Sequence, residues 1–433
     1  LSHSSAASDV YKRQLKMIIT DKSIIITLAV PVFLLLIVIE YLYGLKVGKN
    51  NYKLSDTFTS LGLGLMSRFP PMLNIGLQGA AFVYVGSYLN LKLLPLDSPI
   101  TWIVGFLLYD LSYYWMHRMH HEIKILWATH SVHHHGEEYN LSTALRQTST
   151  GWLWKWIFYI PMIMVGVPGE VFVTVAGINL VYQFWVHTKH IGHLGILEKI
   201  FITPMNHGVH HAKNAEYIDA NYGGVFIIWD RMFGTYIPER SDIKPVYGTV
   251  KPLNSWNPIW ANFQVFYQMV QDTIHTKKLS DKFKIWYGPT SWRPADVIEN
   301  NPNQATVSLT KKYNPPLTNE QKIFGVFQIF SIVILAATVI LTVSSQTYQE
   351  TSIFGLIFVL TVILISSILQ NKENSFNIQL FVSSGLILLI FSGSAVSSSL
   401  LASQVIMVHA LINVLYIGIG IPIQRYSLKE SVN

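Results

Sequence analysis

Long apolar segments constrain the fold of this chain more than any other feature. The first, SIIITLAVPVFLLLIVIEYLY, covers residues 23–43. At about 1.5 Å per residue, a helix of this length crosses a hydrocarbon core of roughly 30 Å. A second apolar region runs from 58 to 90 with RFPP at 68–71, and a third covers 99–116. We therefore expect membrane-spanning helices, with a kink or break at the Pro pair.

The remaining apolar segments predict a helical hairpin and a C-terminal bundle. Residues 152–186 hold two apolar stretches separated by GVPGE at 166–170, which indicates a hairpin that spans or dips into the bilayer. Residues 187–320 are polar and mixed, and we expect them to face water. Four more apolar segments follow, at about 323–343, 353–369, 378–395 and 400–423.

Composition supports a membrane protein and limits its chemistry. Half of the residues are hydrophobic and only 13% are charged, a balance typical of polytopic membrane proteins. The chain has no cysteine, so disulfides, iron–sulfur clusters and thiolate nucleophiles are excluded, and any metal must be held by nitrogen or oxygen. The formal charge of +7 is modest and forms no dense run, which indicates membrane-flanking charge and no nucleic-acid partner.

The distribution of Lys and Arg predicts the orientation. Basic residues follow the first segment, lie between the third segment and the hairpin, and are frequent in 187–322. In contrast, the loop at 91–98 has one basic residue and the loop at 344–352 has none. By the positive-inside tendency, the N-terminus is outside, and the histidine-bearing segments and the C-terminus are cytoplasmic. Residues 1–16 are polar and precede Met17, so we interpret them as translated vector sequence or a short disordered tail.

Histidines concentrate in four places with a recurring spacing. HRMHH covers 117–121, HSVHH covers 130–134, FWVHTKH contains His187, and NHGVHH ends at His211. Positions i, i+3 and i+4 of a helix share a face, so we expect each H-x-x-H-H to bring three imidazoles together. Neutral imidazole is a good ligand for iron, zinc or copper, and nine imidazoles suit two ions better than one. The nine candidate metal ligands are His117, His121, His130, His133, His134, His187, His207, His210 and His211.

Other interpretations of the histidines are less consistent with the pattern. A metal-buffering tract is usually of low complexity, whereas this spacing recurs in register on predicted helices. A bis-histidine haem site needs two separated histidines within spans, and a lone His409 on an apolar helix is expected to be structural. Four further histidines stay open as ligands: His120, His135, His190 and His193. The expected fold class is all-α, a polytopic membrane helical bundle with a cytoplasmic-facing, histidine-rich di-metal cap.

The histidine motifs resemble those of the fatty acid hydroxylase/sterol desaturase superfamily of membrane di-iron enzymes. Three longer runs resemble its alkylglycerol monooxygenase branch more than the sterol enzymes: WMHRMHHEIKILWATHSVHHHGEEYNLSTALRQT, YQFWVHTKHIGHLGILE and NHGVHHAKNAEYIDANYGGVFIIWDRMFGTY. The resemblance covers at least residues 57–240, and the extra C-terminal spans also fit that branch.

The resemblance implies a non-haem site with two iron ions that uses O2 to hydroxylate a lipid alkyl chain. In the alkylglycerol enzymes the attacked carbon lies next to the ether oxygen, the product decays to a fatty aldehyde and glycerol, and a tetrahydropterin supplies electrons. The nine histidines would be the ligands. Three acidic residues are candidate catalytic residues: Glu122, Asp110 and Asp230. Glu122 could act as a base or hydrogen-bond partner, and Asp110 and Asp230 could orient ligand imidazoles. The alternative for both aspartates is a structural role, in helix capping or in an ion pair.

The implied organisation is a leader at 1–16, a membrane-embedded hydroxylase domain with the di-iron site at 17–320, and a four-helix transmembrane region at 321–433. The expected partners are a membrane lipid, O2 and an external electron donor, because no electron-transfer motif is fused to the chain. The site would face the cytoplasm, at the endoplasmic reticulum of a eukaryote or the inner membrane of a bacterium. Two alternatives stay open: a sterol or fatty-acyl hydroxylase or desaturase, and a divalent-metal transporter or zinc-binding membrane protein.

Overall fold

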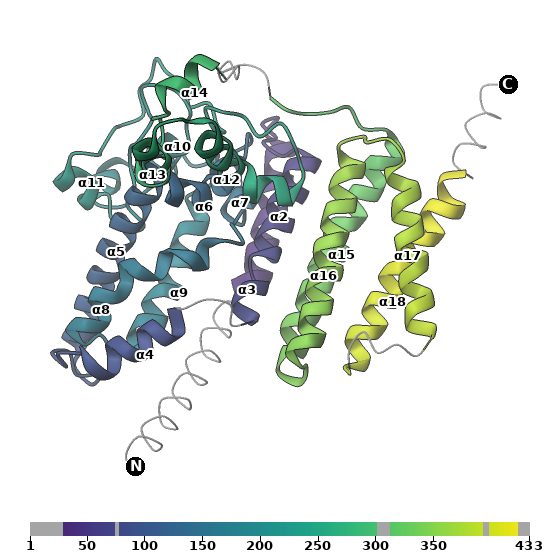
Figure 1. Cartoon of the computed structure of the whole chain (residues 1–433), viewed down its shortest axis with the longest axis horizontal. Helices are drawn as coiled ribbons and strands as arrows, with labels where there is room; N and C mark the ends of the chain where they lie inside the picture. The colour runs from purple at the N-terminus through teal and green to yellow at the C-terminus, as the bar shows by residue number, and fades with distance from the viewer. Residues whose placement is uncertain (1–28, 74–77, 301–311, 393–397, 423–433) are drawn as a thin grey trace, which may run out of the picture.

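The computed structural model describes residues 29–73, 78–300, 312–392 and 398–422, and within these ranges the chain is helical without a β-strand (Figure 1). Extended pairing there is limited to three isolated bridges, such as Ile123 with Pro289. The predicted all-α class is therefore confirmed. The interpretation of residues 1–16 lies outside the described residues.

Four of the described helices are long and apolar enough to cross a membrane. They are Ala29–Lys46, Asn319–Ser345, Tyr348–Leu369 and Leu400–Gly420. Many of their apolar side chains lie on the outside of the protein, as expected of helices surrounded by lipid; Phe330 and Leu356, for example, are 61% and 60% exposed. The chain is a multi-pass membrane protein, as the apolar segments predicted.

The second apolar region is divided as the Pro pair indicated. Helix α2 (Leu54–Met66) ends before RFPP, the short α3 (Phe69–Met72) contains both prolines, and α4 (Gln78–Tyr88) follows. The predicted hairpin is less regular than expected. Its first arm consists of 3₁₀ turns and α8 (Ile160–Val165), and Gly166 in the left-handed region ends α8 before the second arm, α9 (Gly169–Trp185).

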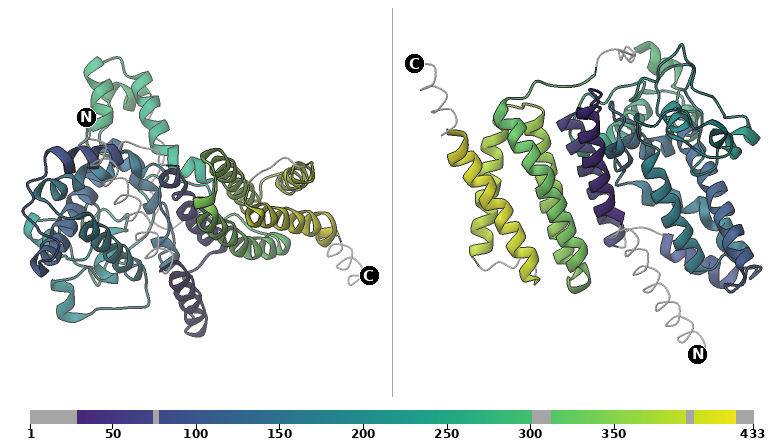
Figure 2. Two further views of the ribbon diagram at one scale, coloured as in Figure 1. Left: turned by 90° about the horizontal axis from the view of Figure 1, so that it is seen from below. Right: turned by 180° about the vertical axis from the view of Figure 1, so that it is seen from behind.

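The C-terminal helices form a group beside α2 (Figures 1 and 2). They are α15 (Asn319–Thr342), α16 (Tyr348–Leu369), α17 (Ser375–Phe391) and α18 (Leu400–Leu415), the last continued by a π-helical turn. Their apolar core is continuous with α2. A Cβ at Gly62 of α2 would lie 2.8 Å from Cγ1 of Val362, so the close approach of α2 to α16 requires glycine.

The histidine-bearing helices lie on the other side of α2, at one end of the spans (Figure 1). Helix α5 (Pro99–Glu122) carries the first cluster, α6 (Lys124–His134) the second, and α10 (Pro204–His210) most of the last. Ile123 has an extended backbone between α5 and α6, and the N–H of Lys124 donates to the carbonyl of Gly288. This single extended residue turns α6 back, so that the clusters of α5 and α6 face each other.

The remaining helices surround the histidines. Helix α7 (Leu141–Ala144) follows α6, and α11 (Ile228–Phe233) packs against α5. Helix α12 (Pro258–His275) packs against α6, and α13 (Leu279–Tyr287) and α14 (Ala295–Asn300) follow it. The residues from 187 to 300 therefore form a cap over the site end of the spans (Figure 1).

Candidate metal centre

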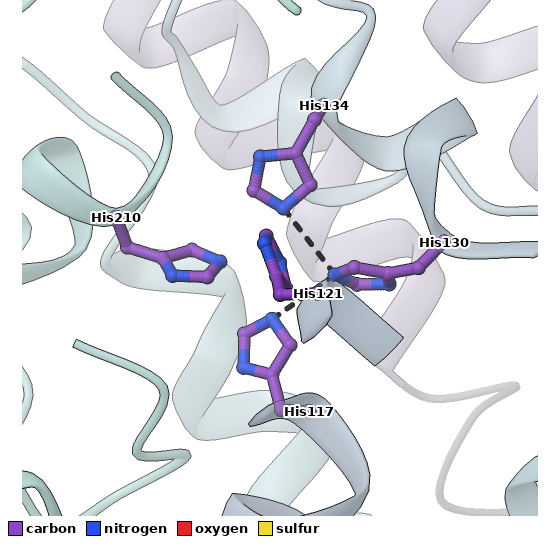
Figure 3. Close-up of side chains that lie close together, drawn as sticks. All are labelled: His117, His121, His130, His134 and His210. Atoms are coloured by element: carbon purple, nitrogen blue, oxygen red, sulfur yellow. Dashed lines mark hydrogen bonds between the residues drawn. The ribbon is translucent and has the colours of Figure 1, made fainter. Parts of the chain in front are cut away.

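The structure gathers the nine predicted histidines into two compact groups. The first group is His117, His121, His130, His134 and His210, and the second is His133, His187, His207 and His211. Within each group, the candidate ligand atoms all lie within 4.8 Å of one another. Figure 3 shows the rings of the first group pointing toward a common centre from α5, α6 and α10. Sequence positions as far apart as 117 and 211 thus converge on one place.

The two H-x-x-H-H motifs are each divided between the groups, which corrects the expectation that each would supply three imidazoles to one place. His130 and His134 enter the first group, whereas His133 enters the second. His207 and His211 enter the second group, whereas His210 enters the first. At about 100° per residue, positions i and i+4 point about 40° apart, whereas i+3 and i+4 point about 100° apart. Each motif therefore spans both groups.

Nitrogen atoms of the first group approach each other closely. Nε2 of His130 lies 3.0 Å from Nε2 of His117 and 3.3 Å from Nε2 of His134 (Figure 3). Backbone carbonyls hold the far side of two rings: Nδ1 of His117 donates to Tyr222 at 2.8 Å, and Nδ1 of His210 donates to Ala220 at 2.9 Å. These bonds place the proton on Nδ1 and leave the lone pair on Nε2, facing the centre of the group.

The second group has the same construction. Nδ1 of His133 donates to the carbonyl of Arg146 at 2.9 Å, and Nδ1 of His187 donates to that of Gln183 at 2.8 Å. Both Nε2 atoms then carry lone pairs, yet they lie 3.3 Å apart. Two facing lone pairs repel each other unless a cation lies between them, so this geometry fits a metal ion.

Distances and unpaired atoms also fit a metal ion in each group. Two nitrogens bound at right angles to an ion at about 2.1 Å lie about 3.0 Å apart. In the second group, the Nε2 atoms of His187 and His207 are 3.0 Å apart, and those of His207 and His211 are 3.1 Å apart. In the first group, Nε2 of His121 and Nε2 of His210 are buried without a hydrogen-bond partner. Buried imidazole nitrogens without a hydrogen-bond partner are the ligand atoms that a bound metal ion would use.

Burial keeps these imidazoles neutral, which is the form that binds a metal. All nine side chains are buried. Burial lowers the pKa of His187 to about 3, and burial lowers the pKa of His210 to about 4 despite its bond to Ala220. Neither group contains a carboxylate. An all-nitrogen set of this kind suits iron, zinc or copper better than magnesium or calcium.

The two groups adjoin each other. The ring of His134, in the first group, stacks on that of His211, in the second, with centroids 4.3 Å apart. The neighbouring rings of His210 and His211 have centroids 5.3 Å apart. Two ions held by these groups would therefore be close neighbours, as in a dinuclear centre.

Asp110 contacts none of the nine histidines by a hydrogen bond. Its carboxylate accepts the backbone N–H groups of Val225 at 2.8 Å and Phe226 at 3.0 Å. It also accepts side-chain N–H groups of Trp229 and Asn179, both at 2.9 Å. Asp110 thus fixes the loop 222–226 to α5, and its effect on an imidazole is exerted through this loop.

Asp230 holds the other end of the same loop. It accepts the backbone N–H groups of Tyr222 at 2.7 Å and Gly223 at 2.8 Å, and the hydroxyl of Thr235 at 2.7 Å. Because the carbonyl of Tyr222 accepts Nδ1 of His117, Asp230 orients a candidate ligand through one peptide unit. Burial raises the pKa of Asp230 to about 6, against these hydrogen bonds. Any effect of Asp230 on an imidazole would therefore be indirect. The guanidinium group of Arg231, the neighbour considered as an ion-pair partner of Asp230, lies over the ring of Tyr236.

Glu122 and the four open histidines lie outside both groups. Glu122 accepts a hydrogen bond from Nε of Arg118 at 2.8 Å, and its side chain is 37% exposed. His120 donates from Nδ1 to Met116, and His193 contacts Glu198 at 3.1 Å with a side chain that is 66% exposed. The two others, His135 and His190, are likewise in neither group.

Arg146 is a supporting residue that the sequence did not single out. It is fully buried, and its carbonyl holds His133. Its side chain donates to the carbonyl of Val132 at 3.1 Å, to Asp56 at 3.3 Å and to Ser60 at 3.2 Å. It thereby connects α6 to α2. No spacing pattern marks Arg146 or Asp56, because their partners are far away in the sequence.

Glu40 is a second supporting residue, and its position in the sequence could have indicated its importance. It is the only charged residue of the apolar segment 23–43, and such residues in spans are usually functional or paired. Its carboxylate accepts the N–H of Leu141 at 2.8 Å and the hydroxyls of Tyr52 and Thr188. Since Thr188 follows His187, Glu40 joins the first span to the second group.

Comparisons with known proteins agree with this site. Residues 102–235 match the family model described as fatty acid hydroxylase. The chain is 43% identical to an alkylglycerol monooxygenase of Danio rerio over 269 residues, 61% of this chain and 59% of the relative. It is 38% identical to that of Xenopus tropicalis over 290 residues (67% and 62%), and 40% identical to that of Homo sapiens over 267 residues (61% and 59%). The chain spans about three fifths of the length of these relatives. No solved structure matches.

Proposed function

We propose that this chain is a membrane oxygenase that uses O2 to hydroxylate a lipid alkyl chain, because residues 102–235 match the family model described as fatty acid hydroxylase. The proposed substrate is an alkylglycerol, an ether lipid cleaved to an aldehyde and glycerol. Three relatives that match 61–67% of this chain are named for this activity. The observation that carries the proposal is the convergence of nine imidazoles into two adjoining, carboxylate-free groups.

We propose that each group holds one iron ion. His117, His130 and His134 would bind through Nε2 in the first group, and His133 and His187 through Nε2 in the second, since these atoms face the centre of each group. When bound, two neighbouring irons supply the redox chemistry with which O2 attacks a C–H bond. The protein contributes the burial that excludes water and the backbone carbonyls that fix the imidazole tautomers.

The acidic residues fit positioning roles in this proposal. Asp110 and Asp230 both bind loop 222–226, which presents the carbonyl of Tyr222 to His117. The carboxylate of Glu122 is instead engaged by Arg118 at the protein surface. We therefore assign no proton transfer to Glu122, and we assign Asp110 and Asp230 to holding the first group in shape.

We propose a tetrahydropterin as the electron donor, and a cavity of about 300 Å³ lined by aromatic and charged side chains supports this choice. The cavity is lined by Lys53, Asp56, Glu137, Glu138, Trp256, Lys312, Tyr313 and Asn314. Its aromatic side chains suit a flat ring, and its carboxylates suit ring N–H groups. Two of the lining residues have a buried polar atom without a hydrogen-bond partner, Oδ2 of Asp56 and Nε1 of Trp256. Through Asp56 and Arg146, the cavity is connected to His133.

The donor proposal is tested with Trp256→Leu. We expect a higher KM for tetrahydropterin with an unchanged KM for the lipid. Trp260→Leu, a half-buried residue outside the cavity lining, is the matched control. Equal pterin KM values in both variants and the parent, or turnover that needs a protein reductase, would contradict the assignment.

We also propose that the histidine groups face the cytoplasm, and that the boundary of the hydroxylase domain lies near 320, at the start of α15. The support for the orientation is the Lys and Arg content of 187–322 against the loop at 344–352, which has neither. A single cysteine at Asp242, an exposed position of the cap, should react with an impermeant thiol reagent only after intact cells are permeabilised. Reaction in intact cells would reverse the orientation.

The function as a whole is tested by O2-dependent turnover of the purified protein. We expect loss of an alkylglycerol and release of a fatty aldehyde with tetrahydropterin. Hydroxylation of a sterol or a fatty-acyl lipid instead would favour the alternative substrate class within the same family. Metal transport without oxygen consumption would refute an oxygenase.

A further inference from the structure

Helix α12 presents an apolar face to the outside of the protein. Five of its side chains are exposed by 38–63%: Ile259, Phe263, Tyr267, Val270 and Ile274. They follow a spacing of three or four residues, so they form one stripe along the helix. Apart from His275 at its end, every exposed residue of α12 belongs to this stripe. A helix that faced water would carry polar residues at these positions.

Helix α13 continues the stripe. Leu279, Phe283 and Tyr287, again four residues apart, are 64–68% exposed. The turn between the two helices is basic, with Lys277 and Lys278 exposed. We call these eight apolar residues of α12 and α13 the hairpin stripe. Apolar residues with basic residues beside them are typical of helices that lie on an anionic membrane surface.

The hairpin begins at the level where a span ends. Ser255, just before α12, donates a hydrogen bond from Oγ to Oε1 of Gln370, which caps the C-terminus of the span α16. Figure 1 shows α12 and α13 end-on while α15 and α16 are seen from the side. Figure 2 shows the two helices projecting sideways from the body of the protein. The hairpin therefore runs across the spans, along the plane of the membrane surface.

The opposite face of the hairpin packs against the rest of the protein. Met269 packs against Ala128 of α6, and Asp272 accepts hydrogen bonds from Arg293 at 2.8 and 2.9 Å. The stripe is thus a second face of α12, separate from the one that supports the histidine-bearing α6. Within the part of the chain that the structure describes, this second face is uncovered.

We propose that the hairpin stripe lies in the interfacial layer of the bilayer, at the histidine end of the spans, where lipid headgroups and the upper parts of acyl chains cover it. The position beside the end of α16, the direction across the spans and the neighbouring lysines all favour lipid over a protein partner. This element would fix α6, and with it both histidine groups, at the membrane surface. Residues 258–287 are then membrane-associated, although their sequence region was expected to face water.

The absence of cysteine makes a direct test practical. Single cysteines at Phe263, Tyr267 and Phe283 would be labelled with an environment-sensitive fluorophore in the full-length protein, reconstituted in nanodiscs. Phe381, 80% exposed on α17, is the lipid-facing control, and Asp242, an exposed residue of the cap, is the water-facing control. Lipids that carry a nitroxide in the acyl chain quench labels in the bilayer, and iodide quenches labels in water.

We expect the three stripe labels to resemble the Phe381 label: blue-shifted emission, at least twofold quenching by nitroxide lipids and weak quenching by iodide. Iodide quenching equal to that of the Asp242 label would overturn the proposal. Protection from both quenchers would also overturn it, in favour of a protein partner or a second copy. Circular dichroism of each variant verifies that it is folded, and the test does not depend on enzymatic activity.

Discussion

Replacement of Asp230 by asparagine should weaken metal binding by the first group without removing any ligand. The carboxylate of Asp230 accepts two neighbouring backbone N–H groups, those of Tyr222 and Gly223, on its two oxygens. An amide offers one oxygen, so at least one of these buried N–H groups loses its acceptor. The Tyr222 peptide is then free to move, and its carbonyl is the acceptor that orients His117.

The size of the effect follows from these contacts. A buried N–H without an acceptor costs about 1–3 kcal/mol of folding free energy. Loss of a group that orients a metal ligand typically reduces metal affinity about 10- to 100-fold, or about 1.4–2.7 kcal/mol. Because only the first group contains His117, the loss of affinity should affect one of two bound metals and spare the other.

The assay is a titration of the metal-free protein with Co²⁺, followed by its visible absorption. Asp272→Asn is the matched control, since Asp272 is also buried and binds Arg293, with no hydrogen bond to a histidine of either group. We expect both variants to lose stability, but only Asp230→Asn to show one weakened and one unchanged binding step. Parent-like titration of Asp230→Asn, or equal weakening in the control, would refute the positioning role.

Three further predictions concern the same site. His133→Ala should abolish activity while expression persists and should impair the second metal step, whereas His134→Ala should impair the first; the same step lost in both would contradict the division into two groups. Glu122→Gln should keep at least half of the parent kcat, because its carboxylate is engaged by Arg118 at the surface, and a loss of a hundredfold would restore it as a catalytic group. Acid should destabilise the metal-free protein. In the folded protein the pKa values of His187 and His210 are lowered to about 3 and about 4, whereas in the unfolded chain both imidazoles bind protons below pH 6.5. Protons therefore favour the unfolded chain. The stabilising effect of these two neutral imidazoles is complete above pH 6.5 and is lost as the pH falls toward 4, by about 3 kcal/mol for the pair at pH 5.5; an equal Tm at pH 7.5 and 5.5 in detergent would contradict this.

The sequence allowed the helices and the nine clustered histidines to be predicted, because both depend on local patterns. Apolar length marks the spans, and the Pro pair at 68–71 and GVPGE at 166–170 mark breaks that the structure contains. The assignment of histidines to groups was not predictable in the same way. Whether His133 joins His130 or His187 depends on the rotation of α6 relative to α9 and α10, which no local pattern encodes.

Supporting residues were predicted least well. Asp110 and Asp230 were predicted to orient imidazoles, and their hydrogen-bond partners in the structure include backbone N–H groups of a loop that lies far from Asp110 in sequence. Arg146 is one of the basic residues between the third apolar segment and the hairpin, and nothing in its local sequence indicates that it is fully buried against Asp56. The apolar stripe of α12 was hidden because Asn, Gln and Asp on the inner face make the helix as a whole look polar.

Metal analysis of the purified full-length protein tests the central claim most directly. Protein produced with ample iron, and never exposed to chelators, should contain about two irons per chain, and its Mössbauer spectrum should show two iron sites in equal amounts that interact magnetically. The single variant His187→Ala should lower the iron content while the helical content stays unchanged. One metal per chain, two isolated irons without interaction, or zinc in both sites would contradict a di-iron centre built from the two histidine groups.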